Sequence, residues 1–147
     1  MNLKYHCKRE HVGDVFVKRA IVPVFLVGAN SKKFQFTAVL DSGSDFVLIP
    51  REVADILALK YNEKEIDEAI TFDGSKIVTT QSKLQVILEK DREQQSFNCN
   101  CAILLNKDFD HEDLIFGSSF FENFKITFDY PQGKFSIKST LINLKIN

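Results

Sequence analysis

Short stretches of alternating or continuous apolar residues, separated by turn residues, recur along most of this chain. This pattern is typical of β-strands and leaves room for only two short helices. The predicted strands cover residues 20–27, 34–40, 46–49, 84–88, 96–104, 114–117, 125–130, 134–138 and 141–147. Residues 69–79 carry β-forming side chains on both sides of Asp73-Gly74, which predicts one more hairpin. The fold class predicted from the pattern is therefore all-β, mainly β with two short helices.

The two helices are predicted from local signals. Pro50 favours the first position of a helix, and apolar residues at 53, 54, 56 and 57 then share one helical face. The segment 118–124 suits a second short helix, with Ser118 or Ser119 as its N-cap. Residues 1–19 and 60–69 show no clear pattern, and whether residues 1–19 form an ordered arm is left open.

Length, charge and composition limit the classes of protein to which this chain can belong. A chain of 147 residues fits one domain, which we place at residues 20–147 after an N-terminal arm at 1–19. A net charge of −1 gives no electrostatic reason to expect nucleic acid. No apolar run approaches the ~18 residues of a membrane span, and the N-terminus lacks the apolar segment of a secretory signal. Three cysteines make a disulfide framework improbable, so a cytoplasmic location is expected.

One tripeptide carries candidate chemistry. Asp41-Ser42-Gly43 comes directly after an apolar strand, so the strand would hold the carboxylate of Asp41 in an open turn. The Ser42 hydroxyl can donate hydrogen bonds that brace the loop, together with Ser44, and Gly43 permits close backbone approach. Asp-Ser-Gly alone is a common turn sequence, so its significance depends on the neighbouring segments.

Two segments, about 21–59 and 114–137, together resemble the retropepsin-like aspartic proteases. Asp41-Ser42-Gly43 is similar to the catalytic Asp-Thr/Ser-Gly of that family, and Val47-Leu48-Ile49-Pro50 resembles the segment after that motif in cellular and bacterial members. Leu114-Ile115-Phe116-Gly117 is similar to the second signature of the family, which precedes a short helix and strand like 120–130. The order of the two motifs, and their separation of about 75 residues, matches the family better than either motif alone.

The chain also departs from the family pattern. Serine stands at position 42 in place of the commoner threonine, which keeps the hydroxyl. Ser118 and Ser119 come after Gly117 where viral members often have arginine, so an ion pair from that arginine to Asp45 is missing. The hairpin with Phe72, Asp73, Gly74 and Ser75 lies where the family has its flap, although viral flaps contain more glycine.

The resemblance implies an aspartic endopeptidase with the acid-protease fold. Its mechanism needs two carboxylates that share a proton, a property of aspartic proteases as a class. Asp41 is the one strand-borne aspartate of this kind in the chain, so each chain holds half a site and a C2 homodimer is expected. The substrate would be an extended peptide or unfolded segment, contacted by the hairpin, and no cofactor is expected. Asp45 would either bind the substrate backbone or cap a turn. The strand at 141–146 would pair across the dimer or cover its own sheet.

Two other functions stay open from the sequence. The same fold without catalysis would serve as a dimerisation or peptide-binding module, with Asp41 kept as a turn residue. A generic β-barrel domain that binds a small ligand is a further alternative, and it needs no dimer. A zinc site made of Cys7, Cys99, Cys101, His6 and His11 fits no common ligand spacing, so the cysteines are predicted to be free thiols. His111 is predicted to be a surface histidine in an acidic loop.

Overall fold

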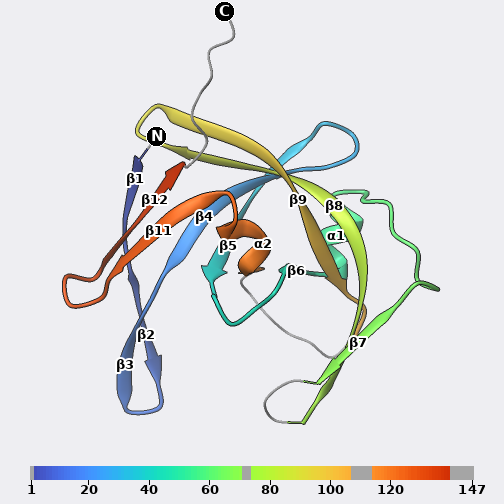
Figure 1. The fold of residues 1–147 in the computed structure, drawn as a ribbon, viewed down its shortest axis with the longest axis horizontal. Helices are drawn as coiled ribbons and strands as arrows, with labels where there is room; N and C mark the ends of the chain where they lie inside the picture. Colours follow the sequence, from blue (N-terminus) through green and yellow to red (C-terminus); the bar gives the residue numbers. More distant parts are fainter. Residues whose placement is uncertain (1, 71–73, 107–113, 140–147) are drawn as a thin grey trace, which may run out of the picture.

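Twelve strands and two short helices make up the described part of the chain, which comprises residues 2–70, 74–106 and 114–139 of a computed structural model (Figure 1). The elements in chain order are β1 (Asn2–His6), β2 (Lys8–Val12), β3 (Val15–Arg19), β4 (Ile21–Val27), β5 (Lys33–Leu40), β6 (Val47–Pro50), α1 (Arg51–Ile56), β7 (Asp67–Ile70), β8 (Lys76–Lys90), β9 (Glu93–Leu104), β10 (Leu114–Phe116), α2 (Ser118–Phe121), β11 (Phe124–Asp129) and β12 (Lys134–Ser139). The prediction of a mainly β chain with two short helices is confirmed. Within these residues, neither helix has the length or apolarity needed to cross a membrane.

A seven-stranded sheet forms the body of the molecule. Its strand order is β4-β5-β10-β6-β9-β8-β7, and β4 also pairs with β8, so the sheet curls back on itself. The long strand β8 makes this possible, because it pairs with β9 along most of its length, with β7 near its start and with β4 nearer its end. The sequence pattern predicted the start of this strand, as the second half of the hairpin at 69–79, and its middle at 84–88, but not the polar stretch at 80–83 that joins them.

The short strand β10 lies in the middle of this sheet. It runs parallel to β5, with Phe116 opposite Leu40, and antiparallel to β6, with Phe116 opposite Val47. Segments far apart in sequence are thereby joined at the point where β5 ends. The residue directly after β5 is Asp41, so this pairing positions the candidate catalytic turn.

The first nineteen residues form three strands, of which one pairs with the C-terminal part of the described chain. Strand β1 pairs with β12 in a three-stranded sheet, β1-β12-β11, and the ring of Tyr5 stacks on Phe135 at 5.1 Å between centroids. Strands β2 and β3 form a separate two-stranded hairpin. The arm that the sequence left open is thus β-structure from residue 2 onwards.

Phenylalanine fills much of the core beneath β10 and α2. Phe120 of α2 is fully buried and lies 5.0 Å from Phe116 and 4.9 Å from Phe124, between ring centroids. Phe97 of β9 completes the cluster at 5.0 Å from Phe124. Aromatic pairs at these distances contribute beyond their buried area, so this cluster holds α2 against the sheet although the helix has only four residues.

Both helices differ slightly from their predictions. Pro50 is the N-cap of α1 and ends β6, so the helix begins one residue later than expected. The prediction that Ser118 or Ser119 caps α2 is wrong, because Gly117 is the N-cap and no side chain caps the helix. The predicted strand at 141–147 lies outside the described residues, as do Phe72, Asp73 and His111.

Candidate active site

Asp41 lies immediately after β5, in an exposed turn between β5 and β6. Its backbone N–H donates to the carbonyl oxygen of Phe116 at 3.0 Å, and the N–H of the preceding Leu40 donates to the carbonyl oxygen of Ala20 at 2.9 Å. The backbone that carries the carboxylate is therefore held by β10 on one side and by Ala20, the residue before β4, on the other. The carboxylate itself is accessible to solvent.

The turn after Asp41 is closed by local hydrogen bonds. The N–H of Gly43 donates to Oδ1 of Asp41 at 2.9 Å, and the N–H of Ser44 donates to the Asp41 carbonyl at 3.2 Å. The Ser44 hydroxyl donates to the carbonyl of Phe46 at 3.0 Å. These bonds fix one carboxylate oxygen, and the other accepts no hydrogen bond from any described residue.

The second motif packs directly onto this turn. The N–H groups of Gly117, Ser118 and Ser119 donate to the carbonyls of Phe46, Ser44 and Asp45 at 3.1, 2.8 and 3.1 Å. A Cβ at Gly117 would lie 2.2 Å from the Ser44 carbonyl oxygen, so the backbones meet at a distance that only glycine allows. Ile115 and Phe116 provide the strand that leads to this contact. The structure therefore brings the two sequence motifs together into one unit.

Ser119 has a role that the sequence did not indicate. Its hydroxyl accepts a hydrogen bond from the N–H of the buried Val47 at 3.0 Å, which satisfies the first backbone group of β6. A helix-capping role was predicted because serine is common at helix starts, and local sequence gives no sign of a partner 72 residues away.

We expect Ser119→Ala to destabilise the protein by about 1 to 2 kcal/mol, because the N–H of Val47 would lose its partner in a partly buried site. Ser118→Ala is the matched control, since no hydrogen bond of its hydroxyl is found among the described residues. Urea unfolding of both variants measures the difference. Equal midpoints for the two variants would contradict the assigned role of Ser119.

A cavity of about 360 Å³ opens beside Asp41. It is lined by β3, the end of β5 and the turn after β11, through Val17, Lys18, Arg19, Val39, Leu40, Asp41 and Tyr130. Nζ of Lys18 donates to the Tyr130 carbonyl at 2.7 Å, which ties β3 to that turn. Lys18 and Arg19 were not expected here, because no structure was predicted for their segment.

The structure does not test the roles predicted for the remaining site residues. The hydroxyl of Ser42 and the carboxylate of Asp45 are exposed and form no hydrogen bond with other described residues. Gly74 and Ser75 belong to the β7–β8 hairpin and do not line the cavity beside Asp41. The predictions for Ser42, Asp45 and the hairpin stay predictions.

Cys99 and Cys101 lie on one face of β9 and are buried, as their spacing predicted. Among the described residues, no three His, Cys, Asp or Glu side chains gather closely enough to hold a metal ion. Burial raises the pKa of Cys99 to about 11 and that of Cys101 to about 12, from an ordinary value of 9.0. Both thiols are therefore protonated at neutral pH.

These raised pKa values predict a loss of stability at high pH. Above pH 9 the thiols ionise in the unfolded chain but not in the folded one, so the free energy of unfolding falls as pH rises from 9 towards 11. We expect each thiol to contribute a loss of about 1 kcal/mol by about pH 10. Urea unfolding between about pH 8 and 10 tests this, with Cys101→Val, which has no titrating group, as the control. The same slope in both proteins would refute it.

The structure is similar to a solved structure. The crystal structure of a retropepsin-like aspartic protease from Rickettsia conorii superimposes with a TM-score of 0.61 at 17% sequence identity, over 92% of this chain and 98% of that chain. No protein-family model matches the sequence, and no curated protein does. A similarity at this identity shows the fold alone. The chain therefore has the retropepsin-like fold predicted from its two motifs.

Proposed function

We propose that this protein is an aspartic endopeptidase whose active site forms between two copies of the chain. The observation that carries the proposal is the placement of Asp41. Its carboxylate is exposed at the end of a central strand, beside a cavity, in a turn held by the second motif through backbone hydrogen bonds. The retropepsin-like fold supports the same function.

The chemistry requires two such carboxylates. One acts as general base towards a water molecule, and the other, protonated, donates to the carbonyl oxygen of the scissile peptide. Two carboxylates held within ~3 Å cannot both ionise, so they share one proton and divide these roles. A C2 dimer with Asp41 near its axis supplies the pair with identical geometry from each chain. The exposed Ser42 hydroxyl is then free to bond to the partner.

An extended polypeptide fits this arrangement as substrate. It would lie between the two chains in β-like form, with alternate side chains entering pockets on either side of the dyad. The cavity beside Asp41 is one such pocket, with Lys18 and Arg19 in its wall. Arg19 is paired with Glu10 at 2.7 Å, so Lys18 is the cation of this wall without a carboxylate partner among the described residues. The β7–β8 hairpin, whose strand β7 is exposed along its whole length, would cover the substrate as a flap.

The test is cleavage of a mixture of denatured proteins from about pH 3.5 to 7, at protein concentrations high enough for dimers to form. Peptide fragments from the wild type that are absent with Asp41→Asn would support the proposal, and the cut sites would define the pockets. If neither protein cleaves anything, the inactive dimerisation or peptide-binding module becomes the better assignment.

A further inference from the structure

The β2–β3 hairpin projects from the body of the molecule, to which the hydrogen bond from Lys18 to the Tyr130 carbonyl ties its base. Its two strands pair only with each other among the described residues, through a tight turn at Gly13 and Asp14. A two-stranded hairpin is at best marginally stable in water by itself. Such an element is expected to gain stability from a surface packed against it.

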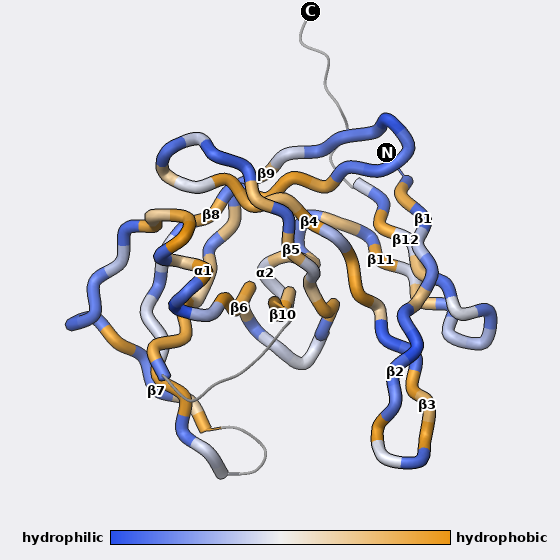
Figure 2. The backbone as a smooth tube through the Cα atoms, turned by 180° about the vertical axis from the view of Figure 1, so that it is seen from behind, coloured by the Kyte–Doolittle hydropathy of each residue, from blue (hydrophilic) through white to orange (hydrophobic). Residues whose placement is uncertain are grey.

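The tip of the hairpin is apolar and exposed. Val12, Val15 and Phe16 expose 51%, 62% and 55% of their surfaces, and Figure 2 shows the hydrophobic colour around the turn. Phe16 is covered on one side only, by the ring of His11 at 3.8 Å and the guanidinium of Arg9 at 5.0 Å. By the register of the hairpin, Val12 and Val15 lie opposite each other on one face and Phe16 lies on the other, beside His11. The projecting tip is therefore apolar on both faces, which is typical of a protein contact.

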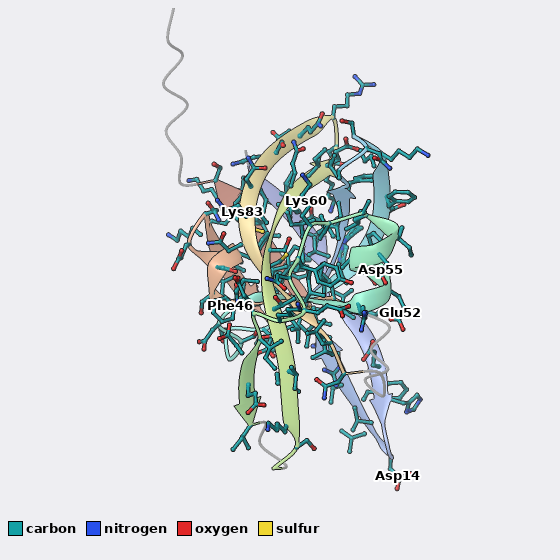
Figure 3. The ribbon with its side chains drawn as sticks, turned by 90° about the vertical axis from the view of Figure 1, so that its right-hand side faces the viewer. Asp14, Phe46, Glu52, Asp55, Lys60 and Lys83 are labelled. Atoms are coloured by element: carbon teal, nitrogen blue, oxygen red, sulfur yellow. The ribbon has the colours of Figure 1, made fainter. Side chains whose placement is uncertain are left out.

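The position of the hairpin indicates what it contacts. Its base, Val17 to Arg19, lines the same cavity as Asp41. From there each five-residue strand spans about 17 Å, and Figures 1 and 3 show the hairpin extending beyond the turn between β5 and β6. Figure 3 labels Asp14 at the far end of the hairpin and Phe46 in that turn. Anything that approaches Asp41 closely from this side meets the hairpin.

We infer that the β2–β3 hairpin is a dimerisation arm, which packs its apolar tip against a second copy of this chain. The inference rests on the proposed function, because a dyad made of two Asp41 carboxylates brings the second copy to this face. Charge at the base of the hairpin suits the same occupant. The four Lys or Arg at positions 8, 9, 18 and 19, with Glu10 and Asp14, give the hairpin a charge of +2 in a chain of net charge −1, so the rest of the second copy has a charge of −3.

Sedimentation velocity over about three decades of concentration measures the dimer dissociation constant. We expect the double variant Val15→Ser/Phe16→Ser to raise the dissociation constant at least about a hundredfold, because each change occurs twice in a C2 interface. The double variant Val12→Thr/Val15→Thr keeps β-branched side chains, which preserve the hairpin, and should raise the dissociation constant at least about tenfold. Ile56→Ser is the control, since Ile56 of α1 is 55% exposed, like Phe16, and α1 lies away from the hairpin.

The outcomes separate this inference from the proposed function. A wild-type dimer that weakens in both hairpin variants but not in Ile56→Ser supports the arm, whether or not the wild type cleaves protein. A wild type that stays monomeric, or hairpin variants that dimerise as tightly as wild type, would overturn it. Hairpin-dependent binding to anionic lipid vesicles with unchanged dimerisation would also overturn it and assign the tip to a membrane surface. Cleavage by a dimer that does not need the hairpin would overturn the arm and leave the protease proposal intact.

Discussion

Replacing Asp41 with asparagine is expected to lower peptide-bond cleavage by at least about a thousandfold while leaving the fold intact. Both carboxylates of the shared dyad are lost at once, and with them the general base and the general acid. The amide oxygen of asparagine can still accept the hydrogen bond from the N–H of Gly43, so the turn keeps its closing interaction. Rates of fragment release across the pH range, with circular dichroism as the check on folding, measure the effect.

Asp91→Asn is the matched control for this prediction. Asp91 is also an exposed turn aspartate, in the β8–β9 turn with a φ of +53°, a conformation that asparagine adopts readily. Its replacement removes the same charge at a position outside the candidate active site, so cleavage activity should stay within about twofold of wild type. Retained cleavage by Asp41→Asn would exclude Asp41 as the catalytic carboxylate.

Mixing the two proteins tests whether the site is shared. If each active site needs Asp41 from both chains, an excess of Asp41→Asn protein captures wild-type chains in inactive mixed dimers and lowers the activity of a fixed amount of wild type. If each chain held a complete site, the added protein would leave the activity unchanged.

The second large effect concerns Gly117, where we expect alanine to destabilise the protein by about 4 kcal/mol or more. The added Cβ would lie 2.2 Å from the carbonyl oxygen of Ser44 and 2.7 Å from that of Phe46, and both are backbone atoms that no side-chain rotation can move aside. Separating the two segments would also break the hydrogen bonds from Gly117 to Phe46 and from Ser118 to Ser44. Gly117 has a negative φ, which alanine also adopts, so the loss of stability comes from steric crowding and not from backbone strain.

Gly43→Ala is the comparison that isolates this crowding. A Cβ there meets only Oδ1 of Asp41, at 3.2 Å, which belongs to an exposed side chain that can shift. We therefore expect a loss of less than about 1 kcal/mol. Urea unfolding of both variants provides the free energies, and a loss at Gly117 no larger than that at Gly43 would show that the turn and the second motif separate without cost.

The local pattern of the sequence was sufficient for several features of this protein. Alternating apolar positions identified most strands, because burying one face of a strand imposes a period of two, as Cys99 and Cys101 show. The Asp41-Ser42-Gly43 and Leu114–Gly117 motifs together predicted the fold. Residues 80–83 of β8 and the hairpin at residues 8–19 were missed. The first are polar, and the two strands of the hairpin are exposed on both faces, so neither segment carries such a period.

Other features were decided only by the tertiary structure. Pairing of β10 between β5 and β6 brings Gly117 against Ser44 and turns Ser119 from an expected helix cap into the hydrogen-bond acceptor for Val47. The cavity beside Asp41 likewise includes Lys18 and Arg19 only because β3 reaches it. The physical reason is the same in each case. Apolar periodicity and turn residues act between neighbours in the sequence, whereas a hydrogen bond or a steric contact between distant segments depends on which strands pair, and in which register.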